Sequence, residues 1–280
     1  MSGTFPHDGA PLLEARGIDV SYAGKPVLAG IDLAVRPREI VSLLGASGCG
    51  KSTLLKVLAG LISADHGERR FLGEPLDAPH PRSALVFQQA GLLPWLDVAG
   101  NVGFGLDFKH QPALSANQRH QRVAQAIEAV GLSEHARAFP AQLSGGMAQR
   151  VAIARALARQ PALLFADEPF SALDAITRAE MQLLLTGLVQ RWHTAVLLVT
   201  HDIDEAILTA DRIVLMSGSP GRILHEWEVP ISRPRDAAPQ AFAALKLEIL
   251  AALRQRHNNI TQPASSENAN ETRKPLDYVR

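Results

Sequence analysis

The spacing of apolar residues divides the first part of the chain into strand-like and helix-like stretches. Residues 12–22 and 25–35 alternate apolar and polar positions between turn residues, which is typical of short antiparallel strands that face a core. Residues 39–45 (EIVSLLG) form a compact apolar run, and residues 51–61 (KSTLLKVLAGL) have helical period. A glycine-rich loop separates these two segments, so the pattern predicts a strand, a loop and a helix. A further strand is expected at 83–88.

Residues 89–160 have a different pattern, with few β-branched runs. Two segments, 116–132 and 147–160, carry apolar residues at spacings of three, four and seven, which indicates helices. We therefore expect a mainly helical insert between two strand-rich regions.

Beyond the insert, apolar strands alternate with helices. Residues 162–169 (ALLFADEP) and 194–202 (TAVLLVTHD) are compact apolar runs, and helices are expected at 173–192 and 203–210. This alternation predicts a largely parallel sheet that is covered on both faces. The remaining expected elements are strands at 212–217 and 221–229, a helix at 239–254, and a disordered tail at 256–280 that is rich in Asn, Ser, Glu and Pro.

The composition limits the classes of function. The 280 residues include 28 Lys and Arg and 28 Asp and Glu, so the formal net charge is zero, which argues against a basic nucleic-acid binder. Cys49 is the single cysteine, so no disulfide can form within the chain. The N-terminal region lacks the pattern of a signal peptide, and no apolar run approaches the roughly 18–20 residues of a membrane span. These features predict a soluble cytoplasmic protein.

The glycine-rich loop carries the clearest chemical motif. Residues 45–53 (GASGCGKST) fit G-x-x-x-x-G-K-[ST] between the predicted strand and helix. Its glycines let consecutive N–H groups converge on phosphate oxygens, and the helix that follows adds its positive end. Lys51 is expected to reach the β- and γ-phosphates, and Ser52 to ligate Mg²⁺. The predicted nucleotide-binding residues are Gly45, Ala46, Ser47, Gly48, Cys49, Gly50, Lys51, Ser52 and Thr53, with Cys49 as a small neutral filler.

Other predicted strands end in polar groups, at the edge where open α/β sheets bind ligands. Asp167 ends one apolar strand and suits Mg²⁺, while Glu168 is placed to polarise an attacking water. His201 ends a second strand, and Gln88, a neutral group able to touch Mg²⁺ and water, ends a third. Any one of these polar residues, taken alone, is explained simply by the exposure of a strand end to solvent. Together with the phosphate loop they predict a nucleotide-hydrolysing site.

Residues 143–150 (LSGGMAQR) resemble the start of a phosphate-binding helix but contain no lysine. Ser144 and the first N–H groups of the helix would form an anion site. Taken alone, the segment is better explained by an ordinary capped helix.

The ordered motifs make the chain similar to ATP-binding cassette ATPases over about residues 12–230. These motifs are the phosphate loop, Gln88, LSGG at 143–146, LLFADE at 163–168, SALD at 171–174 and His201. The resemblance implies an α/β fold with a P-loop NTPase (RecA-like) core, an N-terminal antiparallel β-subdomain and an inserted α-helical subdomain. The implied division is a cassette at 12–255, with core and β-subdomain at 12–88 and 161–230, helical subdomain at 89–160, C-terminal helix at 231–255, and a tail at 256–280.

The same resemblance implies a head-to-tail homodimer. Each ATP, with Mg²⁺, would lie between the phosphate loop of one chain and the signature segment of the other. Tyr22 would stack on adenine, and Asp174 would link the two sites. The implied catalytic residues are Glu168, His201 and Gln88; the Mg²⁺ ligands are Ser52, Gln88 and Asp167; and the signature residues acting on the partner's ATP are Leu143, Ser144, Gly145, Gly146 and Met147. Met147 departs from the family pattern, which commonly has Gln there, and we expect activity to survive because the contact is mostly through Ser144 and the backbone.

Residues 91–106 (GLLPWLDVAGNVGFGL) place Leu93, Trp95 and Leu96 on a loop and helix start. These side chains expose apolar surface unless they pack within the helical insert. In the family a membrane permease docks here, and the Leu-Pro-Trp pattern with LSGGM looks similar to importer subunits for nitrate, sulfonates, taurine and pyrimidines. The resemblance implies a peripheral protein on the cytoplasmic face of the inner membrane. Its implied partners are transmembrane permease subunits and, indirectly, a periplasmic solute-binding protein, with no nucleic acid.

Two other functions fit part of the pattern. A soluble cassette ATPase could act on a non-transport assembly, but the chain has one cassette and no coiled-coil insertion between Gln88 and Leu143. A small-molecule kinase or GTPase shares only the phosphate loop, and the guanine-reading Asn-Lys-x-Asp is absent. An ATPase that powers an importer is therefore the main hypothesis.

Overall fold

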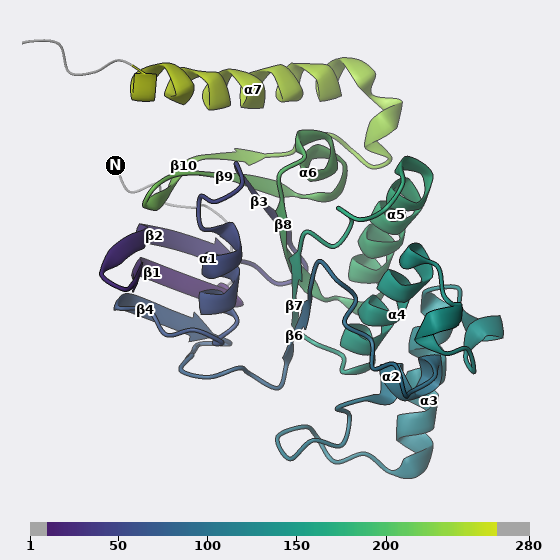
Figure 1. Cartoon of the computed structure of the whole chain (residues 1–280). Helices are drawn as coiled ribbons and strands as arrows, with labels where there is room; N and C mark the ends of the chain where they lie inside the picture. Colours follow the sequence, from purple (N-terminus) through teal and green to yellow (C-terminus); the bar gives the residue numbers. More distant parts are fainter. Residues whose placement is uncertain (1–9, 262–280) are drawn as a thin grey trace, which may run out of the picture.

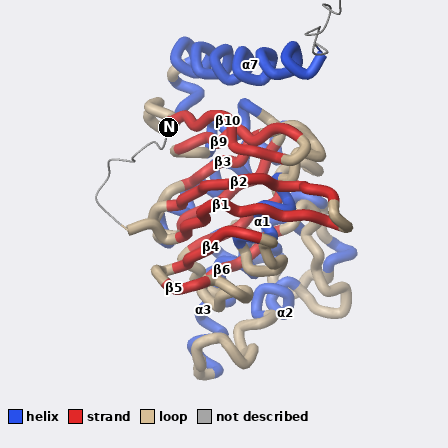
Figure 2. The backbone as a smooth tube through the Cα atoms, turned by 90° about the vertical axis from the view of Figure 1, so that its left-hand side faces the viewer, coloured by secondary structure: helices blue, strands red, loops and turns tan. Residues whose placement is uncertain are grey.

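The computed structural model of the chain describes residues 10–261. Its strands form one ten-stranded mixed sheet in the order β5-β4-β1-β2-β10-β9-β3-β8-β7-β6. Figure 2 shows β2, β1 and β4 lying side by side in this sheet. The strands are β1 (Leu13–Tyr22), β2 (Lys25–Val35), β3 (Ile40–Leu44), β4 (His66–Phe71), β5 (Glu74–Pro75), β6 (Ser83–Val86), β7 (Leu163–Asp167), β8 (Ala195–Thr200), β9 (Arg212–Gly218) and β10 (Gly221–Glu228).

Helices cover both faces of the parallel strands (Figure 1). The α-helices are α1 (Lys51–Leu58), α2 (Val98–Gly103), α3 (Ala116–Ala129), α4 (Gly145–Ala158), α5 (Ala175–Trp192), α6 (Ile203–Thr209) and α7 (Pro239–Thr261). Short 3-10 turns are η1 (Ser133–His135), η2 (Pro140–Gln142) and η3 (Arg235–Ala237). Helices α2, α3 and α4 fall within the expected helical insert. In the described part of the chain no helix is both long and apolar enough to cross a membrane.

Strands β9, β3, β8, β7 and β6 form the parallel half of the sheet. Because side chains alternate across a strand, β3 contributes to two cores. Ile40 and Leu44 pack with the helices on the α4–α5 side, whereas Val41 and Leu43 pack with α1 and the β1–β2–β4 layer. The expected parallel sheet with two covered faces is therefore confirmed, and its carboxyl edge carries the polar residues considered below.

The other half of the sheet is mainly antiparallel, as expected for the N-terminal strands. Strands β1 and β2 pair antiparallel with Leu13 opposite Val35. Two strands, β4 and β5, were not foreseen from the sequence. Strand β4 (HGERRF) buries only Phe71 fully, so its sequence does not alternate apolar and polar residues. Backbone pairing with β1 holds it in the sheet instead.

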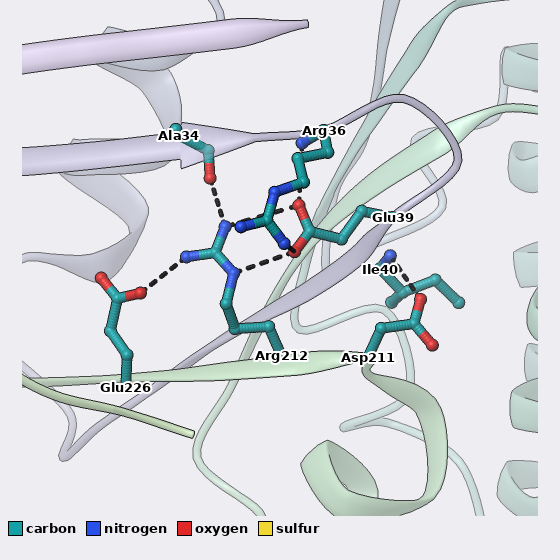
Figure 3. A network of polar contacts seen from close by, with 7 residues as sticks. All are labelled: Ala34, Arg36, Glu39, Ile40, Asp211, Arg212 and Glu226. Carbon is teal, nitrogen blue, oxygen red and sulfur yellow. Dashed lines mark hydrogen bonds and ion pairs between the residues drawn. The ribbon is translucent and has the colours of Figure 1, made fainter. Parts of the chain in front are cut away.

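A buried ion network joins the two halves (Figure 3). The Arg212 guanidinium of β9 donates to Glu39 Oε1 at 2.9 Å and to Glu226 Oε2 at 2.7 Å. It also donates to the backbone carbonyl of Ala34 at the end of β2. Because Arg212 and Glu39 are each less than a tenth exposed, neither charge has solvent to replace its partner. Removing one partner would therefore leave an uncompensated buried charge between the two halves.

Helix α7 runs beyond α6 and β10, outside the sheet (Figure 1). Ile249 is fully buried, and the Lys246 ammonium lies 2.7 Å from an Asp204 carboxylate oxygen on α6. The helix extends to Thr261, so residues 256–261 belong to it rather than to the expected tail. Residues 262–280 lie outside the described part of the chain. The proposed division into subdomains stays a prediction.

Candidate functional site

The phosphate loop connects the end of β3 to α1, as its motif predicted. A Cβ at Gly45 would lie 2.1 Å from the Met216 carbonyl oxygen, so only glycine fits against β9. Cys49 is buried, with its Sγ 3.5 Å from the same carbonyl. The Lys51 ammonium donates to the carbonyls of Gly45 at 2.7 Å and Ala46 at 2.9 Å. The Lys51 side chain therefore lies along the loop and is held by its backbone carbonyls.

The first turn of α1 meets the end of β7. The Ser52 hydroxyl donates a hydrogen bond to Asp167 Oδ1 at 2.9 Å. Mg²⁺ in nucleotide sites is commonly held by one or two carboxylates together with substrate phosphates, so this hydroxyl–carboxylate pair is a suitable donor set. The described residues contain no cluster of three His, Cys, Asp or Glu side chains that could hold a metal without such phosphates.

Glu168 and His201 lie side by side at the ends of β7 and β8. His201 Nδ1 is 3.3 Å from Glu168 Oε1. Glu168 has a φ of 45°, in the left-handed region that costs a non-glycine residue about 1 kcal/mol or more, and its N–H donates to the Val199 carbonyl at 3.0 Å. A carboxylate and an imidazole thus share one corner of the sheet edge.

Both residues line a small cavity of about 40 Å³. Burial raises the pKa of the Glu205 carboxyl to about 7; the charges of Asp202 and Glu168 raise it too, while a Thr200 hydrogen bond and Arg178 lower it. The lining residues are Glu168, Ser171, Arg178, Thr200, His201, Asp202 and Glu205. Glu205 was not predicted from the sequence, because an acidic residue in the first turn of a helix is usually solvated.

The signature segment forms the N-terminus of α4, as expected. Ser144 is the N-cap, and its hydroxyl accepts a hydrogen bond from the Met147 N–H at 3.2 Å. A Cβ at Gly146 would lie 2.5 Å from Thr177 Cγ2, whereas a Cβ at Gly145 would meet no atom within 4 Å. Contacts within the chain therefore require glycine at position 146 but not at position 145. The Met147 side chain is half-buried against the core.

Helix α4 also holds the segment that follows β6. The Gln149 side chain donates to the Phe87 carbonyl at 3.2 Å. Arg155 donates to the carbonyls of Ala90 at 2.8 Å and Gly91 at 2.9 Å. The Gln88 segment is therefore attached to the signature helix, although β6 itself ends two residues before Gln88.

Four predicted residues lie apart from this cluster. Tyr22 is 47% exposed at the end of β1, and Gln88 and Ser144 are exposed as well. Asp174 caps α5, where hydrogen bonds from Thr177 hold its pKa below the ordinary value. Within the described chain, no side-chain hydrogen bond connects these residues to Lys51, Ser52 or Asp167. One chain therefore assembles the phosphate loop, Ser52–Asp167 and Glu168–His201, and leaves the signature segment outside.

The sequence is similar to those of known transport proteins. A family model described as ABC transporter matches residues 28–171, which include the phosphate loop, the signature segment and Asp167. The chain is 46% identical over 252 residues to the aliphatic sulfonates import ATP-binding protein SsuB 2 of Burkholderia lata, covering 90% of each chain. It is 47% identical over 252 residues to SsuB 1 of Xanthomonas axonopodis pv. citri, with the same descriptive name, covering 88% of this chain and 99% of the relative.

Solved structures share the fold. One is a dimeric post-hydrolysis state of the ATP-binding cassette MJ0796 bound to ADP and Pi, with a TM-score of 0.67, 32% identity, and coverage of 78% of this chain and 98% of that one. Another is cbiO1 of Clostridium perfringens, part of the ABC transporter complex cbiONQ, with a TM-score of 0.73, 25% identity, and coverage of 89% and 98%. The expected α/β fold of the P-loop type is confirmed.

Proposed function

Because the chain belongs to the ABC transporter family and is an ATPase coupled to transport, we propose that it powers the import of aliphatic sulfonates. The names of the Burkholderia and Xanthomonas relatives support this choice of solute. The sequence motifs alone resembled those of importers for a wider group of solutes, namely nitrate, sulfonates, taurine and pyrimidines, and the relatives favour the sulfonates within this group. An ATPase of a non-transport assembly is not favoured, because both relatives are import proteins by name.

ATP would bind with its phosphates in the loop between β3 and α1. Lys51 would exchange its bonds with the Gly45 and Ala46 carbonyls for bonds with the β- and γ-phosphates. Ser52, Asp167 and Gln88 would hold Mg²⁺, which when bound neutralises phosphate charge. Tyr22, exposed at the end of β1, would stack on the adenine.

Glu168 and His201 would carry the chemistry. Glu168 would accept a proton as water attacks the γ-phosphorus; an oxygen–phosphorus bond forms and the bond to ADP breaks. His201 would hold the γ-phosphate and orient the water. The 3.3 Å contact between the two side chains carries this proposal, because it places a base and a phosphate-binding group together beside the phosphate loop.

The second half of each ATP site would come from another copy of the chain. Ser144 and the free N–H groups at the start of α4 would form an anion site. In the described part of the chain, no hydrogen bond connects Ser144 to Lys51, Ser52 or Asp167. Gly145 faces open space, which suits the close approach of a partner-bound phosphate. The dimeric cassette MJ0796 supports a homodimer of this kind. Asp174, at the start of α5, would connect the two sites.

An apolar groove beside Gln88 supports docking of a membrane permease. A cavity of about 500 Å³ is lined by Phe87, Leu93, Phe104 and Phe108, among others. Trp95 is 70% exposed, so it contributes little to the fold of this chain. The Leu93–Leu96 stretch would form the rim of the groove. The ATPase would then sit peripherally at the cytoplasmic face of the inner membrane, and a periplasmic binding protein would deliver the solute.

Helix α4 would couple the groove to the ATP site. Its Gln149 and Arg155 bonds hold the backbone of the Phe87–Gly91 segment. Its N-terminus carries the signature residues. A shift of the docked permease would therefore move the signature segment as ATP closes the dimer, and hydrolysis would reopen it.

Solute uptake by the host tests this proposal. A strain lacking the gene would be complemented with the wild type, Lys51→Ala, or the matched control Lys56→Ala from the last turn of α1. Uptake of labelled ethanesulfonate should be lost with Lys51→Ala and restored by the other two. Uptake that is unchanged in the deletion strain would contradict the proposal. Loss of nitrate uptake in the deletion strain, with ethanesulfonate uptake unchanged, would show that nitrate and not a sulfonate is the solute.

A further inference from the structure

Arg178, near the start of α5, has a charged side chain to which the scheme above gives no role. It lines the cavity of about 40 Å³ that Glu168 and His201 also line. Of the described residues around this cavity, it is the only one with a permanent positive charge. Its Nε atom is buried and has no hydrogen-bond partner in the described structure. A guanidinium with a buried nitrogen beside these two groups requires an explanation.

On one side, Arg178 holds the loop between β7 and α5. Its Nη2 atom donates to the Leu173 carbonyl at 3.0 Å, and its backbone N–H donates to the Asp174 carbonyl at 2.8 Å. The loop begins at Glu168, whose carbonyl accepts a hydrogen bond from the Ser171 hydroxyl at 3.0 Å. Arg178 therefore fixes the far end of the loop that carries Glu168 at its start.

On the other side, Arg178 faces the turn between β8 and α6. Its Nη1 atom lies 3.8 Å from Asp202 Oδ2. Asp202 directly follows His201, and its N–H donates to the Thr200 hydroxyl oxygen at 3.0 Å. Its Oδ1 atom caps α6 by accepting from the Glu205 N–H at 3.1 Å. His201 thus lies between two residues that are hydrogen bonded to each other, and the guanidinium contacts the second of them.

One side chain therefore connects the two segments that carry Glu168 and His201. His201 Nδ1 and Glu168 Oε1 are 3.3 Å apart, so a shift of either segment changes their contact. The ion pair between Arg178 and Asp202 is about one-third exposed on each side, and pairs of this exposure contribute little to stability. The contact is accordingly better explained by the placement of the two segments than by the stability of the fold.

We propose that Arg178 is a positioning residue for ATP hydrolysis: it fixes the loop that starts at Glu168 against the turn that carries His201, and so holds these two side chains side by side. The proposal rests on the roles given above to Glu168 and His201. The same loop ends at Asp174, the proposed contact with the second copy of the chain. Arg178 thus also connects that contact to the turn of His201.

The test is the steady-state ATPase activity of the full chain with Mg-ATP. Arg178→Met keeps much of the length of the side chain and removes both contacts, so kcat should fall by about tenfold or more, because misplaced reacting groups lower the rate. KM for ATP should change less than about twofold, since the phosphate-binding groups are untouched. The melting temperature should stay near that of the wild type. Arg191→Met, an exposed change in the last turn of the same helix, is the matched control.

A merely structural role would give a different result. Loss of kcat with a parallel rise in KM and a lower melting temperature would overturn the proposal, and so would an unchanged kcat.

A double-mutant cycle tests the path through Asp202. Asp202→Asn keeps the Oδ1 atom that caps α6 but removes the negative charge that faces Arg178. If the arginine acts through this contact, kcat of the double variant should lie within about twofold of that of Arg178→Met alone. Losses of kcat that multiply would show that the two residues act independently and would contradict the proposal.

Two further variants separate this inference from the proposed function. Glu168→Gln combined with Arg178→Met should still dimerise with ATP, because the phosphate loop and the signature segment are intact; loss of the dimer would show that Arg178 serves assembly instead. Glu168→Gln alone is assayed in parallel. If that variant hydrolyses ATP normally, the proposed function fails; if it is inactive while Arg178→Met is normal, only the present inference fails.

Discussion

The Ser52 hydroxyl donates a 2.9 Å hydrogen bond to the Asp167 carboxylate, although 115 positions separate the two residues in the sequence. The bond joins the first turn of α1 to the end of β7, so it connects the phosphate loop to the carboxyl edge of the parallel strands. If the pair holds Mg²⁺, Ser52→Ala should raise the Mg²⁺ concentration for half-maximal ATPase activity by about tenfold or more. A Mg²⁺ titration checks this, with Ser63→Ala, an exposed serine beyond α1, as control. An unchanged titration would exclude Ser52 as a ligand.

Lys51→Ala should weaken ATP binding by at least about tenfold, because a hydrogen bond to a charged group contributes about 1.5–3 kcal/mol. The two carbonyls that Lys51 now contacts belong to the loop itself, so the loop also loses internal contacts. Calorimetric titration with ATP measures the effect against Lys56→Ala. Retained wild-type affinity in Lys51→Ala would contradict the role given to this lysine.

The two signature glycines should respond differently to alanine. Gly146→Ala places a Cβ 2.5 Å from Thr177 and should destabilise the fold by about 1–3 kcal/mol. Gly145→Ala meets no neighbour within the chain, so its melting temperature should stay near that of the wild type while ATP-dependent dimerisation is lost. Thermal unfolding and size-exclusion chromatography separate the two effects. A Gly145→Ala variant that dimerises normally would weaken the case for a shared site.

Glu205 should make stability depend on pH. Its pKa rises from an ordinary value of 4.5 to about 7 on folding, so the folded state binds the proton more tightly. The stabilisation is complete below pH 4.5, declines as the pH rises, and is gone above pH 7, a change of about 3 kcal/mol at most. Glu205→Gln does not titrate there. Its melting temperature relative to the wild type should therefore increase from pH 5 to pH 8, and a constant difference would contradict the raised pKa.

The sequence indicated those parts of the fold where apolar spacing and local motif chemistry agree. The apolar run before Gly45, the strand that ends at Asp167 and the Ser144 cap all lie where the pattern placed them. Strand β4 was missed because it buries a single side chain fully and depends on pairing with β1. The extension of α7 to Thr261 was missed because polar residues give no apolar period there.

Motif order predicted which residues lie at the sheet edge but not the contacts between them. Motif order placed Lys51, Ser52 and Asp167 at one sheet edge, and the structure gives their bonds. The burial of Glu205 could not be inferred, since it depends on how α5 and α6 pack around the His201 turn. The signature segment lies apart from Lys51, Ser52 and Asp167, which fits the proposal that its phosphate belongs to another copy of the chain.

The most direct test of the account is the oligomeric state of Glu168→Gln with millimolar Mg-ATP. The variant keeps the phosphate loop and the Ser52–Asp167 pair but lacks the base, so it should bind ATP and lose about 100-fold or more of its hydrolysis rate. Light scattering after size-exclusion chromatography should then show a stable dimer with ATP and a monomer with ADP. A protein that binds ATP and remains a monomer would contradict an ATP site shared between the phosphate loop and the partner's signature segment.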